Sequence, residues 1–269
     1  MTTANQGKVA LIAGASKGIG AATALAFARA GYAVAIGARN FDALQSVASQ
    51  VEAEGGQALP VKLDVGDVSS SEQFVKQTLE RFGRLDAAFN NATDGPMPAP
   101  LADIDPEQFD IGIRANIRGT FLGMKYQIKA MLQSGGGNIV NMASVAGMRG
   151  FTTLGAYVAG KAGIIGLTKV AALDYADQGI RVNVVAPGPI LTHHIAAAGA
   201  DAQKGAAMST PMQRIGQVEE VASVVLWLCS DQSSFVTGAV IPIDGGQFAG
   251  LKPPRVYRPG QGVKQVGGA

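Results

Sequence analysis

The segment KVALIAGASKGIGAATALAFARA, residues 8–30, joins an apolar run to a run of helical composition through a glycine-rich turn. Residues 8–13 are typical of a buried strand, and the run from Ala21 to Ala30 is typical of a helix. Glycine lets the backbone approach a phosphate closely, and the first N–H groups of a helix attract an anion. The turn is therefore predicted to bind the pyrophosphate of a dinucleotide, at Gly14, Ser16, Lys17, Gly18, Ile19 and Gly20.

The same alternation of strand and helix patterns continues along the chain. Strands are predicted near residues 8–13, 33–38, 58–63, 84–90, 138–143, 181–186 and 239–243. Helical stretches separate them, including 154–175 and 219–230; Asn40 can cap a helix over 42–54, and Ser70 one that ends at Phe82. This pattern predicts a single-domain α/β fold of the Rossmann type, a doubly wound, seven-stranded parallel sheet flanked by helices.

Composition indicates a globular protein with a large core. Of 269 residues, 47% are hydrophobic and 16% charged, and the formal net charge is +2. We expect a catalytic domain over residues 1–250 and a tail over 251–269 that is rich in glycine, proline and basic residues. The cations of the tail are too few to favour nucleic-acid binding.

Cysteine usage and hydropathy suggest a cytoplasmic setting. Cys229 is the single cysteine, so no intrachain disulfide can form, and no residues have the spacing of a metal site. We expect no signal peptide, because the N-terminal segment is short and polar, and no membrane span. Trp227 and Cys229 are expected to be buried in the helix over 219–230.

The end of the second strand bears on cofactor choice. An acid about 20 residues after the glycines binds the ribose 2′-hydroxyl of NAD, whereas a basic residue there accommodates the 2′-phosphate of NADP. Here the strand ends in Ala38-Arg39 and carries no acid. Arg39 is expected to pair with that phosphate and Lys17 to approach it, although both could be solvated surface cations. The pattern favours NADP(H) over NAD(H).

Two further strand ends carry polar residues. Asp64 and Val65 follow the third strand, where Asp64 can accept a hydrogen bond from an adenine amino group. Asn91 and Ala92 follow the fourth strand. They either hold the cofactor or form a turn.

Tyr157, Lys161 and Ser144 form a candidate catalytic group. Tyr157 and Lys161 are four residues apart in a predicted helix, so their side chains share one face. A nearby cation lowers the pKa of a phenol from its usual value of about 10. Tyr157 is thus predicted to exchange a proton with the substrate. Ser144 follows the fifth strand, and its hydroxyl can bind a substrate carbonyl.

With these residues in place, the chain resembles the short-chain dehydrogenase/reductases, including bacterial 3-oxoacyl-carrier-protein reductases, over about residues 7–250. The resemblance depends on motifs in the family's order: Gly14-x-x-x-Gly18-x-Gly20, Asp64, Asn90-Asn91-Ala92, Asn116, Ser144, Tyr157-x-x-x-Lys161 and Pro187-Gly188. It implies hydride transfer between a nicotinamide cofactor and a carbonyl or secondary alcohol.

The resemblance also implies roles for individual residues. Tyr157 would be the general acid/base, Ser144 would orient the substrate oxygen, and Lys161 would lower the Tyr157 pKa and bind the nicotinamide ribose. Asn116 would hold a water relay to Lys161. Further cofactor contacts are implied for Pro187, Gly188, Ile190 and Thr192. Three positions depart from the family pattern, with Ala13 in place of Thr, Thr93 in place of Gly and Gly160 in place of Ser.

Residues 190–212 correspond to the family's mobile substrate lid. They include His193 and His194, which either contact substrate or are solvated, and Met208 and Met212, which suggest an adaptable apolar wall. Met97, Met148 and Phe151 could complete that wall. We expect a neutral, mostly apolar carbonyl substrate.

The leading hypothesis is an NADP(H)-dependent ketone or 3-oxoacyl reductase. The alternatives are an NAD(H)-dependent secondary-alcohol or sugar dehydrogenase and, more remotely, a non-catalytic nucleotide-sensing protein. The resemblance also implies a homotetramer, and we expect the tail to dock on a neighbouring subunit.

Overall fold

Seven parallel strands form one sheet in a computed structural model, which describes residues 5, 7–95 and 97–250. The strand order is β3-β2-β1-β4-β5-β6-β7, and every neighbouring pair is parallel. The strands are β1 (Val9–Ala13), β2 (Ala33–Ala38), β3 (Ala58–Lys62), β4 (Ala87–Asn90), β5 (Gly137–Met142), β6 (Ile180–Pro187) and β7 (Val240–Ile243). The predicted doubly wound sheet is confirmed, with strand ends shifted by up to three residues.

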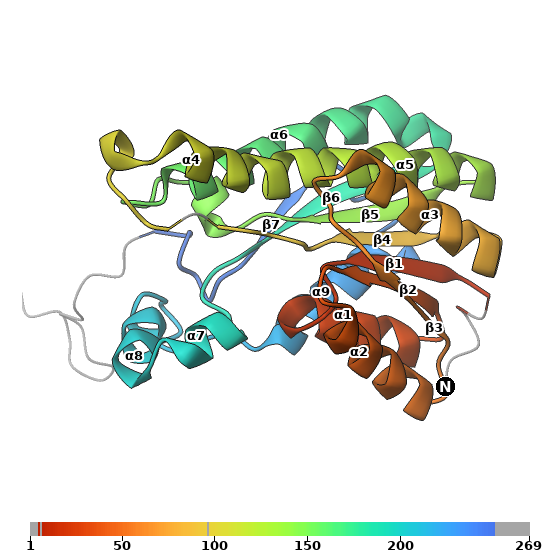
Figure 1. The fold of residues 1–269 in the computed structure, drawn as a ribbon, viewed down its shortest axis with the longest axis horizontal. Coiled ribbons are helices and arrows are strands. Elements are labelled where there is room, and N and C mark those ends of the chain that lie inside the picture. The colour runs from red at the N-terminus through yellow and green to blue at the C-terminus, as the bar shows by residue number, and fades with distance from the viewer. Residues whose placement is uncertain (1–4, 6, 96, 251–269) are drawn as a thin grey trace, which may run out of the picture.

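Helices cover both faces of the sheet (Figure 1). One layer consists of α1 (Gly18–Arg29), α2 (Phe41–Ala53) and α9 (Val218–Leu228). The other consists of α3 (Val68–Phe82), α4 (Pro106–Ile113), α5 (Gly119–Ser134) and α6 (Gly155–Tyr175). Successive strand residues point to opposite faces, so Leu11 and Ile12 belong to different core clusters. Both faces of the sheet are therefore buried.

Helix starts agree with the sequence only in part. Asn40 caps α2 as predicted, because its side chain accepts from the Ala43 N–H at 3.0 Å. The prediction that Ser70 caps α3 is wrong. Asp67 is the cap, and its carboxylate accepts from the Ser70 N–H at 2.7 Å, so the helix begins at Val68. Ser70 instead accepts from the Asp64 N–H at 3.0 Å and fixes the end of β3.

The strand order reverses at β1, which pairs with β2 on one side and β4 on the other. Ligands of open α/β sheets bind beyond the carboxyl ends of the strands at such a point. A buried amide network fixes this region: Asn90 donates to Gln127 at 2.9 Å and to Asn141 at 2.8 Å. The sequence did not predict this network, which ties β4 to β5 and α5.

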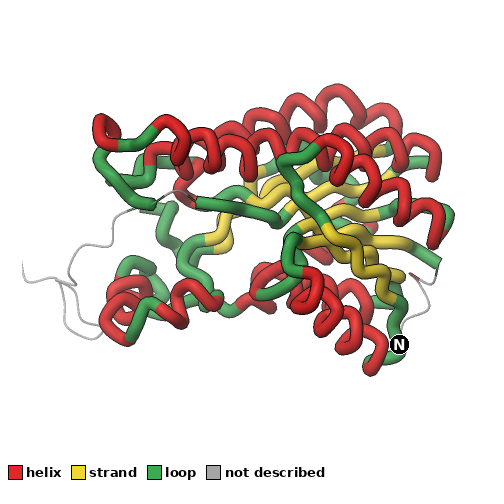
Figure 2. The backbone as a smooth tube through the Cα atoms, in the orientation of Figure 1, coloured by secondary structure: helices red, strands yellow, loops and turns green. Residues whose placement is uncertain are grey.

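The lid region is helical. Residues 190–212 include α7 (His193–Ala197) and α8 (Ala200–Met208), which Figures 1 and 2 show beside the main layers, past the carboxyl ends of the strands. The expectation that Trp227 is buried needs correction. Trp227 on α9 is 37% exposed, although Cys229 is buried. The segment Gly155–Gln178 is long and apolar enough to cross a membrane by length and composition alone, but it packs on β5 and β6.

Candidate active site

A cleft of about 680 Å³ lies at the carboxyl ends of the strands. It brings together every site residue predicted from the sequence except Gly20 and Asn116. The cleft is lined at one end by Arg39 and Asp64 and at the other by Ser144, Tyr157 and Lys161. It thus has the extent and the residues of a dinucleotide site with a catalytic group at one end.

The glycine turn leaves no room for a side chain at Gly14 or Gly20. Gly14 has φ +84°, and a Cβ on it would lie 2.7 Å from the Ala92 Cα. A Cβ on Gly20 would lie 2.1 Å from the Gly14 carbonyl oxygen, which explains why Gly20 is needed although it does not line the cleft. No side chain caps α1 at Lys17, so its first N–H groups remain available to an anion. These residues fit the pyrophosphate of a dinucleotide.

Asn91 braces the turn. Its Nδ2 donates to the Gly14 carbonyl at 2.8 Å, and its backbone N–H donates to the Ala13 carbonyl at 3.0 Å. These two hydrogen bonds hold the ends of β1 and β4 together. They do so without the threonine hydroxyl that the family usually has at position 13, where this chain has Ala13. The Asn91 side chain thus supports the turn, and because Asn91 also lines the cleft, its contact with a cofactor stays a prediction.

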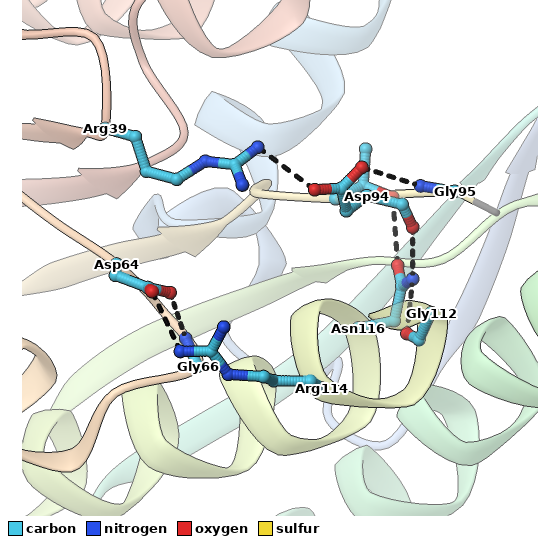
Figure 3. A network of polar contacts seen from close by, with 9 residues as sticks. Arg39, Asp64, Gly66, Asp94, Gly95, Gly112, Arg114 and Asn116 are labelled. Atoms are coloured by element: carbon cyan, nitrogen blue, oxygen red, sulfur yellow. Dashed lines mark hydrogen bonds and ion pairs between the residues drawn. The ribbon is translucent and has the colours of Figure 1, made fainter. Parts of the chain in front are cut away.

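Two ion pairs lie at the end of the cleft lined by Arg39 and Asp64, which we call the adenosine end because the adenosine of a dinucleotide is predicted to bind there (Figure 3). Arg39 Nη2 lies 3.1 Å from Asp94 Oδ2. Arg114 Nη2 lies 2.9 Å from Asp64 Oδ2, while Asp64 Oδ1 accepts from the Gly66 N–H at 2.9 Å. The expectation that Arg39 is free to pair with a phosphate is thus incomplete, since an acid beyond β4 already contacts it.

Tyr157 and Lys161 begin α6 at the other end of the cleft. Lys161 is 1% exposed, and its Nζ donates to the Met142 carbonyl at 3.0 Å. The same Nζ lies 5.6 Å from the Tyr157 ring centroid. Ser144 caps the short helical turn Val145–Gly147, where its hydroxyl accepts from the Ala146 N–H at 3.1 Å. The phenol, the ammonium and the hydroxyl therefore line one part of the cleft.

Burial controls the protonation of this group. It raises the pKa of Tyr157, and an interaction with the Ser144 hydroxyl opposes that effect. Burial also lowers the pKa of Lys161 to about 7. The Tyr157 pKa is therefore raised overall, because desolvation of the phenol is the largest effect, and the lowering contribution expected from Lys161 stays a prediction.

Asn116 is buried beside the cleft, in the π-helical turn Arg114–Arg118 between α4 and α5. Its Nδ2 donates to the carbonyls of Asp94 at 2.9 Å and Gly112 at 2.8 Å, and its Oδ1 accepts from Thr93 Oγ1 at 2.9 Å. A Cβ on Gly160 would lie 3.0 Å from the Asn116 Cβ. Two of the three departures from the family pattern, Thr93 and Gly160, thus contact Asn116.

The lid approaches the glycine turn. A Cβ on Gly18 would lie 3.8 Å from Thr192 Cγ2. His193 and His194 line the cleft with ring centroids 3.8 Å apart, and the pKa of His193 is lowered by burial, by His194 and by Lys17. Three residues of the predicted apolar wall, Met97, Met208 and Met212, do not line this cleft and are 80%, 71% and 64% exposed, so the wall stays a prediction.

Sequence reasoning missed several cleft residues, among them Asp94, Ile111 and Arg114. Asp94 follows the end of β4 by four residues, and that position at the carboxyl edge was a usable signal. Arg114 had no comparable signal, because its contact with Asp64 spans 50 residues of sequence.

The fold and the cleft define a dinucleotide-dependent oxidoreductase, and similar proteins narrow this class. A family model described as enoyl-(acyl carrier protein) reductase matches residues 14–247. The A-factor type γ-butyrolactone 1′-reductase (1S-forming) of Streptomyces virginiae is 41% identical over 243 residues, 89% of this chain and 95% of that protein. Cyclohexanol dehydrogenase of Acinetobacter sp. is 41% identical over 239 residues, 88% and 94% of the two chains.

Among solved structures, NAD⁺-bound xylitol dehydrogenase matches with a TM-score of 0.86 at 34% identity, over 91% of this chain and 100% of that one. The chain belongs to the short-chain dehydrogenase/reductase family. It is an oxidoreductase that acts on alcohol or carbonyl groups with a nicotinamide cofactor.

Proposed function

We propose that the enzyme reduces a neutral, mostly apolar ketone to a secondary alcohol with NADPH, and that Tyr157 gives the proton. The observation that carries this proposal is the raised pKa of Tyr157 at the wall of the cofactor cleft. A phenol with a raised pKa is protonated at neutral pH, which is the form that a proton donor needs. A protonated phenol can give the proton in reduction, and the phenolate that it leaves can take a proton in oxidation.

Each residue of the proposed catalytic group has its own role in the reaction. A nicotinamide cofactor held in the cleft would supply the hydride. Ser144 donates a hydrogen bond to the substrate oxygen and so places it beside the Tyr157 hydroxyl. As negative charge grows on that oxygen, Tyr157 transfers its proton, and Lys161, when protonated, stabilises the phenolate left behind. Lys161 would also hold the nicotinamide ribose, while Asn116 fixes the chain beside the cleft.

Charge at the adenosine end supports NADP(H). Arg39 and Lys17 both line the cleft, and β2 has no acid at its end. A guanidinium and an ammonium suit a phosphate better than a hydroxyl. The alternative is an NAD(H)-dependent secondary-alcohol or sugar dehydrogenase, which the NAD⁺-bound relative and the acid at Asp94 favour.

The names of relatives support an uncharged substrate. They include a γ-butyrolactone 1′-reductase and a cyclohexanol dehydrogenase. A 3-oxoacyl thioester is the second candidate, supported by the description of the matching family model.

We also propose a homotetramer. The outer faces of α5 and α6 expose large apolar side chains, Phe121, Leu132, Val170 and Leu173. An apolar surface on two packed helices suits contact with another subunit. The tail over 251–269 and its docking on a neighbour lie outside the described residues. The domain boundary at residue 250 and cytoplasmic localisation stay predictions.

The test is oxidation of NADPH and NADH, followed at the nicotinamide absorbance, with uncharged ketones, 3-oxoacyl thioesters and keto sugars. We expect turnover with NADPH and an uncharged ketone. Turnover with NADH and keto sugars alone would establish the alternative. Cofactor binding without turnover of any carbonyl compound would favour a nucleotide-sensing protein.

A further inference from the structure

The ion pair between Arg39 and Asp94 crosses the adenosine end of the cleft. Arg39 follows β2 and Asp94 follows β4, and these strands lie on either side of β1. Because neighbouring strands are about 4.8 Å apart, the two side chains reach toward each other over roughly 10 Å of sheet edge. Both line the cleft that also contains the glycine turn. The ion pair thus lies where an adenosine ribose would sit.

The two partners differ in how firmly they are held. The Asp94 carbonyl accepts from the buried Asn116 at 2.9 Å, and Asp94 Oδ1 accepts from the Gly95 N–H at 3.1 Å (Figure 3). The Arg39 side chain is 71% exposed, and Asp94 is the acid that contacts it at 3.1 Å. Arg39 can therefore turn toward a ligand, whereas the Asp94 backbone is fixed and its carboxylate stays at the cleft.

We propose that Asp94 is a cofactor-selectivity residue whose carboxylate competes with the ribose 2′-phosphate of NADPH for Arg39. This inference rests on the proposed use of Arg39 for that phosphate. A phosphate and a carboxylate accept hydrogen bonds from the same N–H donors of one guanidinium, and their negative charges repel each other. NADH has only a hydroxyl at this position, so Asp94 does not compete with it. Asp94 thus lowers the affinity for NADPH selectively.

The test uses Asp94→Asn, which keeps the side-chain shape and removes the charge. Dissociation constants for NADPH and NADH are measured by fluorescence titration of the full chain. We expect NADPH to bind about two- to fivefold tighter to the variant, within the range of an exposed ion pair, and NADH binding to change less than about twofold. An unchanged NADPH constant overturns the proposal, as does weaker NADH binding with NADPH unaffected.

A matched control is Glu54→Gln, which breaks the pair between Arg29 and Glu54. The exposed fractions of that pair, 61% and 36%, are close to the 71% and 36% of Arg39 and Asp94, but neither residue lines the cleft. Both dissociation constants should stay unchanged in this variant. An equal gain in NADPH affinity there would show a general charge effect and overturn the proposal.

A double-mutant cycle separates this inference from the cofactor preference. In an Arg39→Ala background, Asp94→Asn should have less than about a third of its effect in the native chain, because the contested group is gone. If Arg39→Ala selectively weakens NADPH binding while Asp94→Asn leaves NADPH binding unchanged, only the competition by Asp94 is refuted. If Arg39→Ala weakens the binding of NADPH and NADH equally, both the proposed NADP(H) preference and this inference are refuted.

Discussion

The two ends of the cleft use charge in opposite ways. At the catalytic end Lys161 is 1% exposed, and burial lowers its pKa to about 7. At the adenosine end the Arg39 side chain is 71% exposed and has an ion-pair partner. Buried charges are screened little, whereas exposed pairs are screened by water and salt. Changes at the catalytic end should therefore affect rate and stability strongly, and changes at the adenosine end should adjust selectivity by small factors.

The largest expected effect is that of Tyr157→Phe. The substitution removes the hydroxyl that donates the proton and keeps the ring, so turnover should fall by about 10²–10⁴-fold. Steady-state rates at saturating cofactor measure this fall. Dissociation constants for NADPH should stay within about twofold of the native value. A rate near that of the native enzyme would remove Tyr157 from the mechanism.

A second prediction concerns pH and stability. The pKa of Lys161 is about 7 in the folded chain and 10.5 ordinarily, so the unfolded chain binds more protons between these values. The free energy of unfolding should then rise with pH in that window. Above about pH 9 the raised pKa of Cys229, about 12, acts in the opposite direction, which limits the useful range to pH 7–9.

Urea unfolding at these two pH values tests this effect. The native chain without cofactor should gain about 2 kcal/mol from pH 7 to 9 through Lys161, and Lys161→Met should lose that gain. The change with pH is compared, not the absolute stability, because Met also leaves the Met142 carbonyl without its donor. Equal pH slopes in both proteins would contradict the lowered pKa.

Arg39→Ala should have a smaller effect, confined to one cofactor. Loss of an exposed guanidinium that binds a phosphate should raise the dissociation constant of NADPH about tenfold. The dissociation constant of NADH should change less than about twofold, because NADH has no 2′-phosphate. Competitive titration of both cofactors provides the comparison, and equal losses would show that Arg39 does not distinguish them.

The smallest effect is expected on α6, where Gly160 and Gly166 can be compared. Alanine is normally favoured over glycine in a helix by about 0.5–1 kcal/mol. Gly166 has open space, so Gly166→Ala should gain this stability, whereas the Cβ of Gly160→Ala would lie 3.0 Å from the Asn116 Cβ and should cancel the gain. Thermal unfolding of both variants measures the difference. Equal gains in stability would show that the Asn116 side chain can move away from the new Cβ without destabilising the fold.

The sequence predicted most of the fold because its signals are local. Apolar strands, the turn at Gly14 and the cap at Asn40 each depend on a few neighbouring residues. The cap of α3 was misassigned because Asp67 and Ser70 both suit that role, and only the backbone decides between them.

The site was harder to predict where contacts are distant or burial matters. Asp94 meets Arg39 across 55 residues of sequence, and Thr93 meets Asn116 across 23. The four-residue spacing of Tyr157 and Lys161 places both on one helix face but does not reveal how deeply each is buried. Their pKa shifts follow from that burial, which the spacing alone could not reveal.

Isotope transfer tests the central claim most directly. NADPH that carries deuterium at the transferable position of C4 is incubated with the enzyme and an uncharged ketone, and the product is analysed by mass spectrometry. We predict a secondary alcohol with a single deuterium on its carbinol carbon, formed by the native chain and not by Tyr157→Phe. A labelled alcohol formed equally by both proteins, or bound cofactor with no labelled alcohol from any ketone tested, would contradict the account.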